Sequence, residues 1–511
     1  MGDSHHTLLR PVFNGSLRIE GRPDRLTRFA GTPLLRELDE RLGVTSGLAA
    51  QLEDPRELHR VQHSQTSLLR SWIYTMAVHR STETATSDLR FDPALRLAAA
   101  DGRGLAPLDD DQGLLASQPT FSRLLGALSS PKNLGVLEDA VFDSTARAVH
   151  AMNGGKKLEP ITLDIDSFPH PVCGHQDGAE YNKHYGGRVF HPLGVMLGET
   201  GHWLGLKLRP GNVHTADGAT DMLLKLVDKT QAEIADVADV RGDAGFVAGD
   251  LLNTLDKRGI RFAFRLPKNG KVLKKLAEDH NRRPPGRPPQ EPRTWCEEVD
   301  YQAGTWDKSY RVVLVSHERP GELFLHTFFI VTNYPTRVLD SGQVYDHYRE
   351  RGTMETHIGE HQSVVEGFLS SSNRPKTTIN NHPVQKRSKP IDAQAANAAA
   401  LCLHGLAYNL LNTLRLLAGE SGKLMAIYEP SKLHLRRARE RLSTARDKRP
   451  RRGVGQASDA DCVGEDGRDL GPSLEGAAST HACPRSLLIN DNSTKTRKPH
   501  WGKGGGLPVA H

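Results

Sequence analysis

Aromatic residues and long apolar runs are both scarce in this sequence. Aromatic residues make up 6% of the 511 positions, hydrophobic residues make up 37%, and nowhere do about 18 apolar residues follow one another. The absence of such a run predicts that no helix spans a membrane, and we expect no membrane partner. The segment from Met1 to Gly15 also lacks the apolar core of a secretory signal, so we expect a cytoplasmic protein.

Cysteine is scarce as well. The chain has five cysteines, and an odd, scattered set predicts no disulfide framework and fits a reducing compartment. One short cluster, His170, Cys173 and His175, has residue types that bind zinc, but it lacks a clearly spaced second pair. We therefore favour a turn after a strand over a zinc site.

Charge of one sign is only mildly in excess. Lysine and arginine number 67 and aspartate and glutamate number 61, which gives a formal net charge of +6. This bias suits a nucleic-acid partner but is weak evidence alone, because many soluble proteins are equally basic. Basic residues crowd positions 436–452, where they could hold phosphates with a strongly salt-dependent affinity or form a solvated, disordered run.

Changes in composition and in the periodicity of apolar residues divide the chain into three parts. Residues 1–150 carry apolar residues at helical spacing, which predicts short helices and is compatible with either a helix-turn-helix DNA reader or a small bundle. Residues 151–420 alternate strand-like and helical segments, which predicts a mixed α/β sheet. Residues 421–511 are basic and then rich in Gly, Asp and Ser, so we expect a largely disordered tail.

The second part has a predicted order of elements. A strand is expected to end near Asp166, because positions 161–166 alternate as a half-buried strand does. The Pro- and Arg-rich positions 281–292 predict an exposed loop. The further expected strands are 188–197, 203–208, 236–243, 260–266, 310–316 and 323–332. The expected helices are 217–227, 247–257, 341–360 and 393–417.

Acidic residues stand at three separated places in this part. Asp166 closes the first strand, and Asp164 shares its face because strand side chains repeat every two residues. Asp243 lies in a turn of small residues between a strand and a helix, and Glu355 lies on a helix. Phosphodiester transfer commonly uses two Mg²⁺ ions about 3.5–4 Å apart, and Mg²⁺ prefers carboxylate oxygens brought together from distant segments.

Each of these features has an ordinary explanation when taken singly. An aspartate at a strand end is usually a solvated turn residue. Glu355 shares one helical face with Tyr348 and Arg351, and such a face is usually just exposed, although Tyr and Arg there can hold a phosphate. The three acids in order, with the third following a strong strand, favour a metal-dependent site.

Several long blocks of the sequence resemble bacterial insertion-sequence transposases of the DDE type, in the branch with a Tyr-Arg-Glu-Lys signature. The likeness covers roughly residues 10–430 and rests on the combination of blocks. The matching blocks are Asp92–Leu95, Ser117–Thr120, Leu163–Ser167 with Gly174–Gly178, Tyr181–Gly186, Leu208–His214, Arg241–Phe246, Tyr348–Glu355 and Leu406–Leu410.

The resemblance implies a fold and an activity. The expected fold is a ribonuclease-H-like core with a β-rich insertion, preceded by a helical region that binds DNA ends. The expected reaction is cut-and-paste transposition with Mg²⁺, for which Mn²⁺ can substitute. The expected partners are double-stranded DNA, as terminal inverted repeats and target, and a second copy of the chain on that DNA. In a bacterial cytoplasm such a protein would join the nucleoid when bound to DNA.

Motif matching also implies the site residues. The catalytic, metal-binding triad would be Asp166, Asp243 and Glu355. Asp164 is the rival for the first carboxylate, and Asp166 is preferred because the hydroxyl residue Ser167 follows it. The expected DNA contacts are Tyr348, Arg351 and Arg209.

The sequence also departs from the family. The last lysine of the signature would fall seven residues after Glu355, where Gln362 stands, so one phosphate contact is weakened. The segment 370–390 is altered, and the chain after about Leu433 lacks the apolar strands expected there. Glu355 follows Asp243 by 112 positions, which places the insertion at about 266–325.

Other functions fit the same residues. A nuclease that cuts without rejoining would use the same carboxylates. The departures suggest a partly degraded copy, which would act only as a DNA-binding protein. Detection of 3′-end joining separates a transposase from a nuclease, and DNA binding without metal-dependent cutting would indicate a degraded copy.

Overall fold

The computed structural model describes most of the chain between Thr27 and Ala418, together with two short strands, β1 (Leu8–Leu9) and β2 (Ile19–Glu20). Its gaps fall at 28, 79–88, 104–107, 109–113, 155–158, 173–175, 268–269, 281, 287–288, 365–368, 370, 372–377, 380–381 and 384–391. Within the described ranges no helix is long and apolar enough to cross a membrane.

Short helices fill the chain up to Met152, as expected from the apolar spacing. Their starts are set by capping residues: the Ser64 side chain accepts from Ser67 N, and the Asp92 side chain accepts from Leu95 N. The helices and one 3₁₀ turn are α1 (Thr32–Leu42), α2 (Val44–Gln51), η1 (Leu58–Arg60), α3 (Gln65–Ala77), α5 (Pro93–Ala99), α6 (Gln118–Leu128) and α7 (Pro131–Met152).

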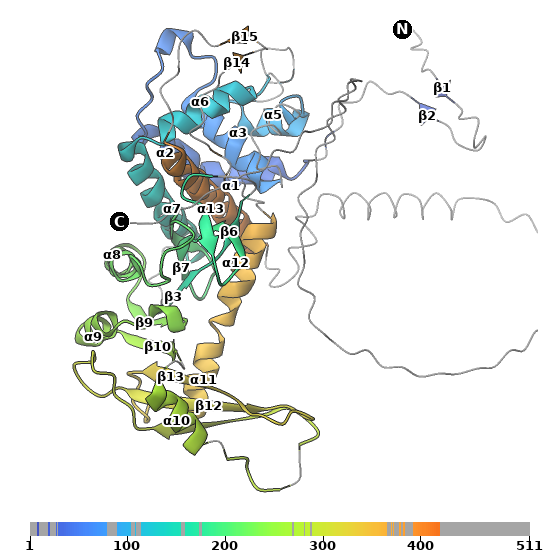
Figure 1. Ribbon diagram of the computed structural model, residues 1–511. Helices are drawn as coiled ribbons and strands as arrows, with labels where there is room; N and C mark the ends of the chain where they lie inside the picture. The colour runs from blue at the N-terminus through green and yellow to red at the C-terminus, as the bar shows by residue number, and fades with distance from the viewer. Residues whose placement is uncertain are drawn as a thin grey trace, which may run out of the picture. The chain divides into compact units, whose positions relative to one another are not determined.

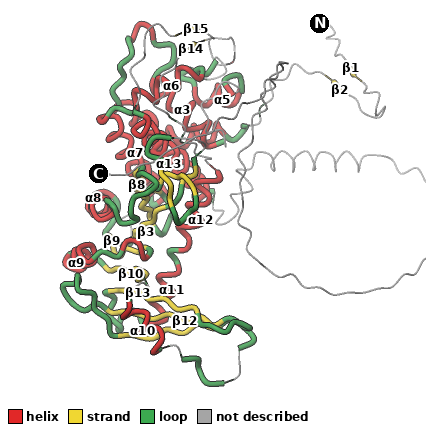
Figure 2. The backbone as a smooth tube through the Cα atoms, in the orientation of Figure 1, coloured by secondary structure: helices red, strands yellow, loops and turns green. Residues whose placement is uncertain are grey.

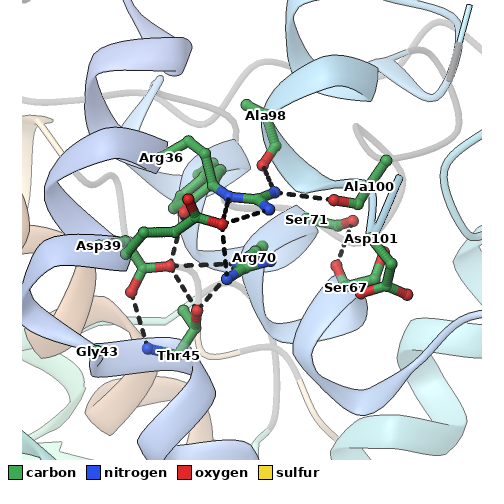
Figure 3. A network of polar contacts seen from close by, with 12 residues as sticks. Arg36, Asp39, Gly43, Thr45, Ser67, Arg70, Ser71, Ala98, Ala100 and Asp101 are labelled. Carbon is green, nitrogen blue, oxygen red and sulfur yellow. Dashed lines mark hydrogen bonds and ion pairs between the residues drawn. The ribbon is translucent and has the colours of Figure 1, made fainter. Parts of the chain in front are cut away.

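A polar network holds the first three of these helices together (Figure 3). The Asp39 side chain is buried and accepts from Thr45 N at 2.8 Å, from the Thr45 hydroxyl and from the Tyr74 hydroxyl at 2.7 Å. Arg70 lies against the same carboxylate, with its Nε 3.4 Å from Asp39 Oδ2. Arg36 of α1 donates to the Ala98 carbonyl at the end of α5. A buried carboxylate with this many donors is structural.

One eight-stranded mixed sheet forms the second half of the fold, in the order β11-β12-β13-β10-β9-β3-β7-β8. The pairs β3–β9 and β9–β10 are parallel, and the other pairs are antiparallel. The strands are β3 (Ile161–Ser167), β7 (Leu193–Leu197), β8 (Trp203–Lys207), β9 (Val237–Gly242), β10 (Arg261–Leu266), β11 (Arg293–Val299), β12 (Arg311–Glu318) and β13 (His326–Thr332).

Helices cover both faces of this sheet. On one face α8 (Ala219–Glu233) packs against β9 and α9 (Gly249–Lys257) packs against β10, in the core that also holds Leu163 and Ile165. The helix α9 is the crossover that the parallel strands β9 and β10 require. On the other face α11 (Ser341–Arg349) packs against β10 to β13 through Val344 and Tyr348. The helix α10 (Lys271–Asp279) follows β10 along the chain (Figure 2). A small separate sheet has the order β4 (His170–Pro171), β6 (Gly187–Phe190) and β5 (Glu180–Asn182).

The structure corrects two details of the sequence prediction. Positions 188–197 form two strands, β6 and β7, which belong to different sheets. The predicted helix 341–360 is two helices, α11 and α12 (Gly352–Val364), separated at Glu350 and Arg351. Helix α10 and strand β11 were not among the predicted elements, and helix α7 was expected only as part of the helical region 1–150.

The helix α13 (Ala393–Leu417) has the predicted bounds, but it lies among the helices of the first 152 residues (Figure 1). It packs against α1, α3, α6 and α7, and its apolar residues share one core with theirs. Asn409 fixes its position: its Oδ1 accepts from Trp203 N at 2.9 Å, and its Nδ2 donates to the Trp203 carbonyl at 3.0 Å. The end of the α/β segment is thus built into the helical region, while the proposed boundary near 150 stays a prediction.

Candidate active site

Two parallel strands carry a ladder of polar side chains on one face of the sheet. Thr162 pairs with Asp239 and Asp164 pairs with Arg241 in the β3–β9 register, so Asp166 and Asp243 come next at the ends of the two strands. Alternation along a strand puts Thr162, Asp164 and Asp166 on one face and Leu163 and Ile165 on the other. We call the six residues Thr162, Asp164, Asp166, Asp239, Arg241 and Asp243 the polar ladder.

Gly242 allows β9 to lie close to its neighbouring strands next to Asp243. A Cβ atom there would lie 2.5 Å from Phe264 and 2.9 Å from Ile165, far inside ordinary contact. A larger residue would therefore push β9 away from its neighbours and displace Asp243, which follows directly. Close packing, and not a turn, is what requires glycine here.

The junction of α11 and α12 supplies the third acid. Glu355 lies in the first turn of α12, and its side chain is 66% exposed. Arg351 stands between this acid and the sheet: its Nη1 is 3.0 Å from Glu355 Oε1 and its Nη2 is 2.7 Å from Asp166 Oδ2. One guanidinium group thus joins the helix acid to the strand acid.

Asp166 is largely buried, and its side chain is 14% exposed. Burial raises the pKa of Asp166 to about 6, against the opposing charge of Arg351. The nearby charges of Asp243 and Glu355 also raise the pKa of this group, because like charges disfavour ionisation. Asp243 and Glu355 therefore both lie close enough to Asp166 to act on it electrostatically.

A metal ion would need oxygen ligands from this group. Among the residues that the structure describes, no set of three or more His, Cys, Asp or Glu side chains is arranged to hold a metal ion. The donor types nevertheless fit, because three carboxylates are the hard oxygen ligands that Mg²⁺ prefers. In the arrangement observed, a guanidinium group occupies the position between two of these carboxylates.

Asp164, the alternative candidate for the first carboxylate, lies two residues before Asp166 on β3 and is more deeply buried. It is 1% exposed, and both of its oxygens accept from Arg241, at 2.8 Å from Nε and 2.9 Å from Nη2. Arg241 also donates to the His347 carbonyl at 2.9 Å and to Glu350 at 2.8 Å, both at the end of α11. This bidentate pair gives Asp164 a structural partner in place of an open side for a metal ion.

The predicted DNA contacts Tyr348 and Arg209 are both buried. Tyr348 is 9% exposed, and burial raises its pKa to about 12. Arg209 is 3% exposed and donates to the carbonyls of His191, Thr215 and Asp217. These bonds fix the loop after β8, and the DNA contact of Arg209 stays a prediction.

Two residues near the acids were not singled out from the sequence. Arg241 was seen only as a member of a matching block, and its pairing depends on the strand register. Tyr185 also lies near the site: burial raises its pKa, and the charges of Asp166 and Asp243 raise it further. Its block, Tyr181–Gly186, was the only sequence signal for it.

Some predicted features lie outside the described residues. Cys173 and His175 of the possible zinc cluster are among them, while His170 lies in β4. The altered segment 370–390 is described only in small parts, and the basic run 436–452 is not described. Gln362 is described, and its Nε2 donates to the Pro169 carbonyl at 2.8 Å.

The fold and site define a class: a mixed α/β protein with acidic residues gathered at the ends of two adjacent parallel strands. The family model described as transposase DDE domain group 1 matches residues 9–437. The chain therefore belongs to the family of DDE transposases, whose members generally use divalent metal ions.

Two further comparisons add less information about the family. A piggyBac transposase, solved by cryo-EM as a synaptic complex with hairpin DNA, is similar to the chain with 12% identity and a TM-score of 0.39. The match covers 84% of this chain and 87% of that one. Among curated proteins no sequence matches the chain.

Proposed function

We propose that this transposase performs cut-and-paste transposition of an insertion sequence by Mg²⁺-dependent hydrolysis and strand transfer. The observation that supports the proposal most is the convergence of Asp166, Asp243 and Glu355 at one edge of the sheet. Asp166 and Asp243 end adjacent parallel strands, and Arg351 links Asp166 to Glu355. We assign the three acids as the catalytic triad on a ribonuclease-H-like core.

Each acid has a distinct position in the proposed reaction. Divalent ions bound here would activate the attacking oxygen and neutralise the leaving oxygen. Asp166 and Asp243 are held by the sheet, so their spacing is fixed by the β3–β9 register. Glu355 is carried by α12 and its side chain is 66% exposed, so it is open to incoming DNA.

The proposed partner is double-stranded DNA, as terminal inverted repeats and as target. Membership of the transposase family supports this partner, and the net charge of +6 is compatible with it. Two copies of the chain would hold the two ends of the element together. Arg351 and Tyr348 lie beside the acids, where they would contact the phosphate next to the cleaved bond.

The test is cleavage and joining of DNA that carries the element's own ends, with Mg²⁺, with EDTA and with Asp243→Ala. Asp250→Ala is the matched control, because Asp250 is an exposed acid in the first turn of α9, close along the chain. We expect metal-dependent cutting and 3′-end joining by the parent and the control, and neither by Asp243→Ala. Cutting that persists in Asp243→Ala would contradict the assignment.

A second candidate is a copy that keeps the fold and binds DNA without cutting it. Position 362 favours this candidate, because Gln362 replaces the expected lysine and its amide is used by the Pro169 carbonyl. DNA binding by the parent, with no metal-dependent cutting under any condition, would establish it. Cutting without joining would instead indicate a nuclease.

A further inference from the structure

Arg351 lies at the centre of the acidic site. Its side chain is 8% exposed, and two of its nitrogens contact Asp166 and Glu355 at 2.7 and 3.0 Å. Its Nε atom is buried and has no hydrogen-bond partner in the described part of the chain. The residue stands at the break between α11 and α12, where Met354 N donates to its carbonyl and its own amide donates to Tyr348. Backbone bonds thus fix where this guanidinium enters the site.

Both carboxylate oxygens of Asp166 already have a donor. Oδ1 accepts from Ser167 N at 2.8 Å, and Oδ2 accepts from Arg351. The guanidinium carries one positive charge, so it compensates part of the repulsion among the three acids. A divalent cation at the same oxygens would be repelled by that charge at contact distance. Cation binding at Oδ2 and the Arg351 contact are therefore alternatives.

If the Arg351 guanidinium leaves Asp166 and Glu355, it needs another anionic partner. A buried arginine without a partner is costly, and the planar guanidinium matches the oxygens of a phosphate as well as those of a carboxylate. Glu355 is 66% exposed, so the solvent side of the pair is open to a ligand. A DNA phosphate that approaches from this side meets Arg351 directly.

We propose that Arg351 is a place-holding cation that exchanges its carboxylate partners for a DNA phosphate when a divalent ion binds. The idea rests on the proposed function, since it needs the acids to be metal ligands. Its consequence is that divalent ion and DNA each tighten the binding of the other. That coupling is reciprocal by thermodynamic linkage, because the free energy of binding both ligands does not depend on their order.

The first measurement is Mn²⁺ binding to the full-length protein at pH 8, followed by electron paramagnetic resonance of the free ion. The variants are Arg351→Gln and, as a matched control, Arg349→Gln, whose side chain is 64% exposed and pairs only weakly with Asp346. Asp243→Ala defines which binding belongs to the site. We expect Arg351→Gln to bind Mn²⁺ at least about tenfold more tightly than the parent, and Arg349→Gln to match the parent.

The second measurement repeats the titration with a duplex that carries the element's terminal sequence. We expect the duplex to tighten Asp243-dependent Mn²⁺ binding in the parent and to lose this effect in Arg351→Gln. If Arg351→Gln binds Mn²⁺ equally or more weakly, or keeps the DNA effect, partner exchange is wrong while the metal site stands. If no Asp243-dependent Mn²⁺ binding occurs in any variant, the metal site and the proposed function fail together.

Discussion

Two aspartates of the polar ladder, Asp164 and Asp166, each pair with an arginine, and the two pairs differ in how much of each is exposed. In the inner pair, Asp164 and Arg241 have side chains 1% and 3% exposed, and both carboxylate oxygens are taken by one guanidinium. In the outer pair, Arg351 contacts two carboxylates. The side chain of Asp166 is 14% exposed and that of Glu355 is 66% exposed. The inner pair has no open side for a ligand, whereas the outer pair has one.

The comparison shows why residue type alone does not separate a ligand from a structural acid. Asp164 and Asp166 are two positions apart on one strand, with the same side chain and the same face. The inner aspartate is used to anchor the end of α11, because Arg241 also binds the His347 carbonyl and Glu350. That anchor places the α11–α12 junction, and with it Arg351 and Glu355, over the strand ends.

The largest expected effect is on stability and separates the two arginines. Arg241→Gln leaves Asp164 as a buried carboxylate without its arginine, which costs about 3–5 kcal/mol of unfolding free energy. Arg351→Gln leaves Asp166, which is 14% exposed, its bond from Ser167 N, so we expect a smaller cost of about 1.5–3 kcal/mol. Chemical denaturation of both variants in EDTA measures the difference. Equal costs would remove the distinction between the pairs.

A smaller effect is expected in the pH dependence of stability. Burial raises the pKa of Asp166 from 3.8 to about 6, so the folded protein binds a proton more tightly than the unfolded chain. The stabilisation from this proton is complete below about pH 4 and is lost as the pH rises through about 6. We expect a loss of the order of 1–2 kcal/mol, after allowing for partial exposure.

Asp166→Asn isolates this contribution, because asparagine stays neutral at every pH. The difference in unfolding free energy between parent and variant, measured in EDTA from pH 4 to pH 8, cancels the other titrating groups. The variant should gain stability relative to the parent as the pH rises. A difference that stays flat, or that changes in the opposite direction, would show that Arg351 outweighs burial at Asp166.

Local sequence patterns predicted many of the helices and strands. Alternation found β3 with Asp166 near its end, and the alanine-rich composition of 393–417 found α13 with the bounds observed. Both signals lie within one element, where neighbouring residues share the same environment. The break between α11 and α12 was missed because it depends on Arg241, which reaches the end of α11 from a strand more than a hundred positions away.

The site was less predictable than the fold. Motif matching brought forward Asp166, Asp243 and Glu355, and the structure gathers them, but their role as a triad stays a prediction. The sequence could not show that Arg351 would contact two of these acids, because that contact joins residues 185 positions apart. The sequence favoured Asp166 over Asp164 only because Ser167 follows it, and it could not show that the register with β9 places Arg241 beside Asp164.

Iron-directed cleavage of the protein tests the central claim most directly, namely that Asp166, Asp243 and Glu355 together hold the divalent ions. Fe²⁺ replaces Mg²⁺ at oxygen-ligand sites, and with ascorbate and peroxide it generates radicals that cut the backbone close to the ion. The account predicts fragments from cuts near all three acids, suppressed by excess Mg²⁺ and absent from Asp243→Ala. Mg²⁺-sensitive cuts confined to other parts of the chain, or cuts unchanged in Asp243→Ala, would contradict it.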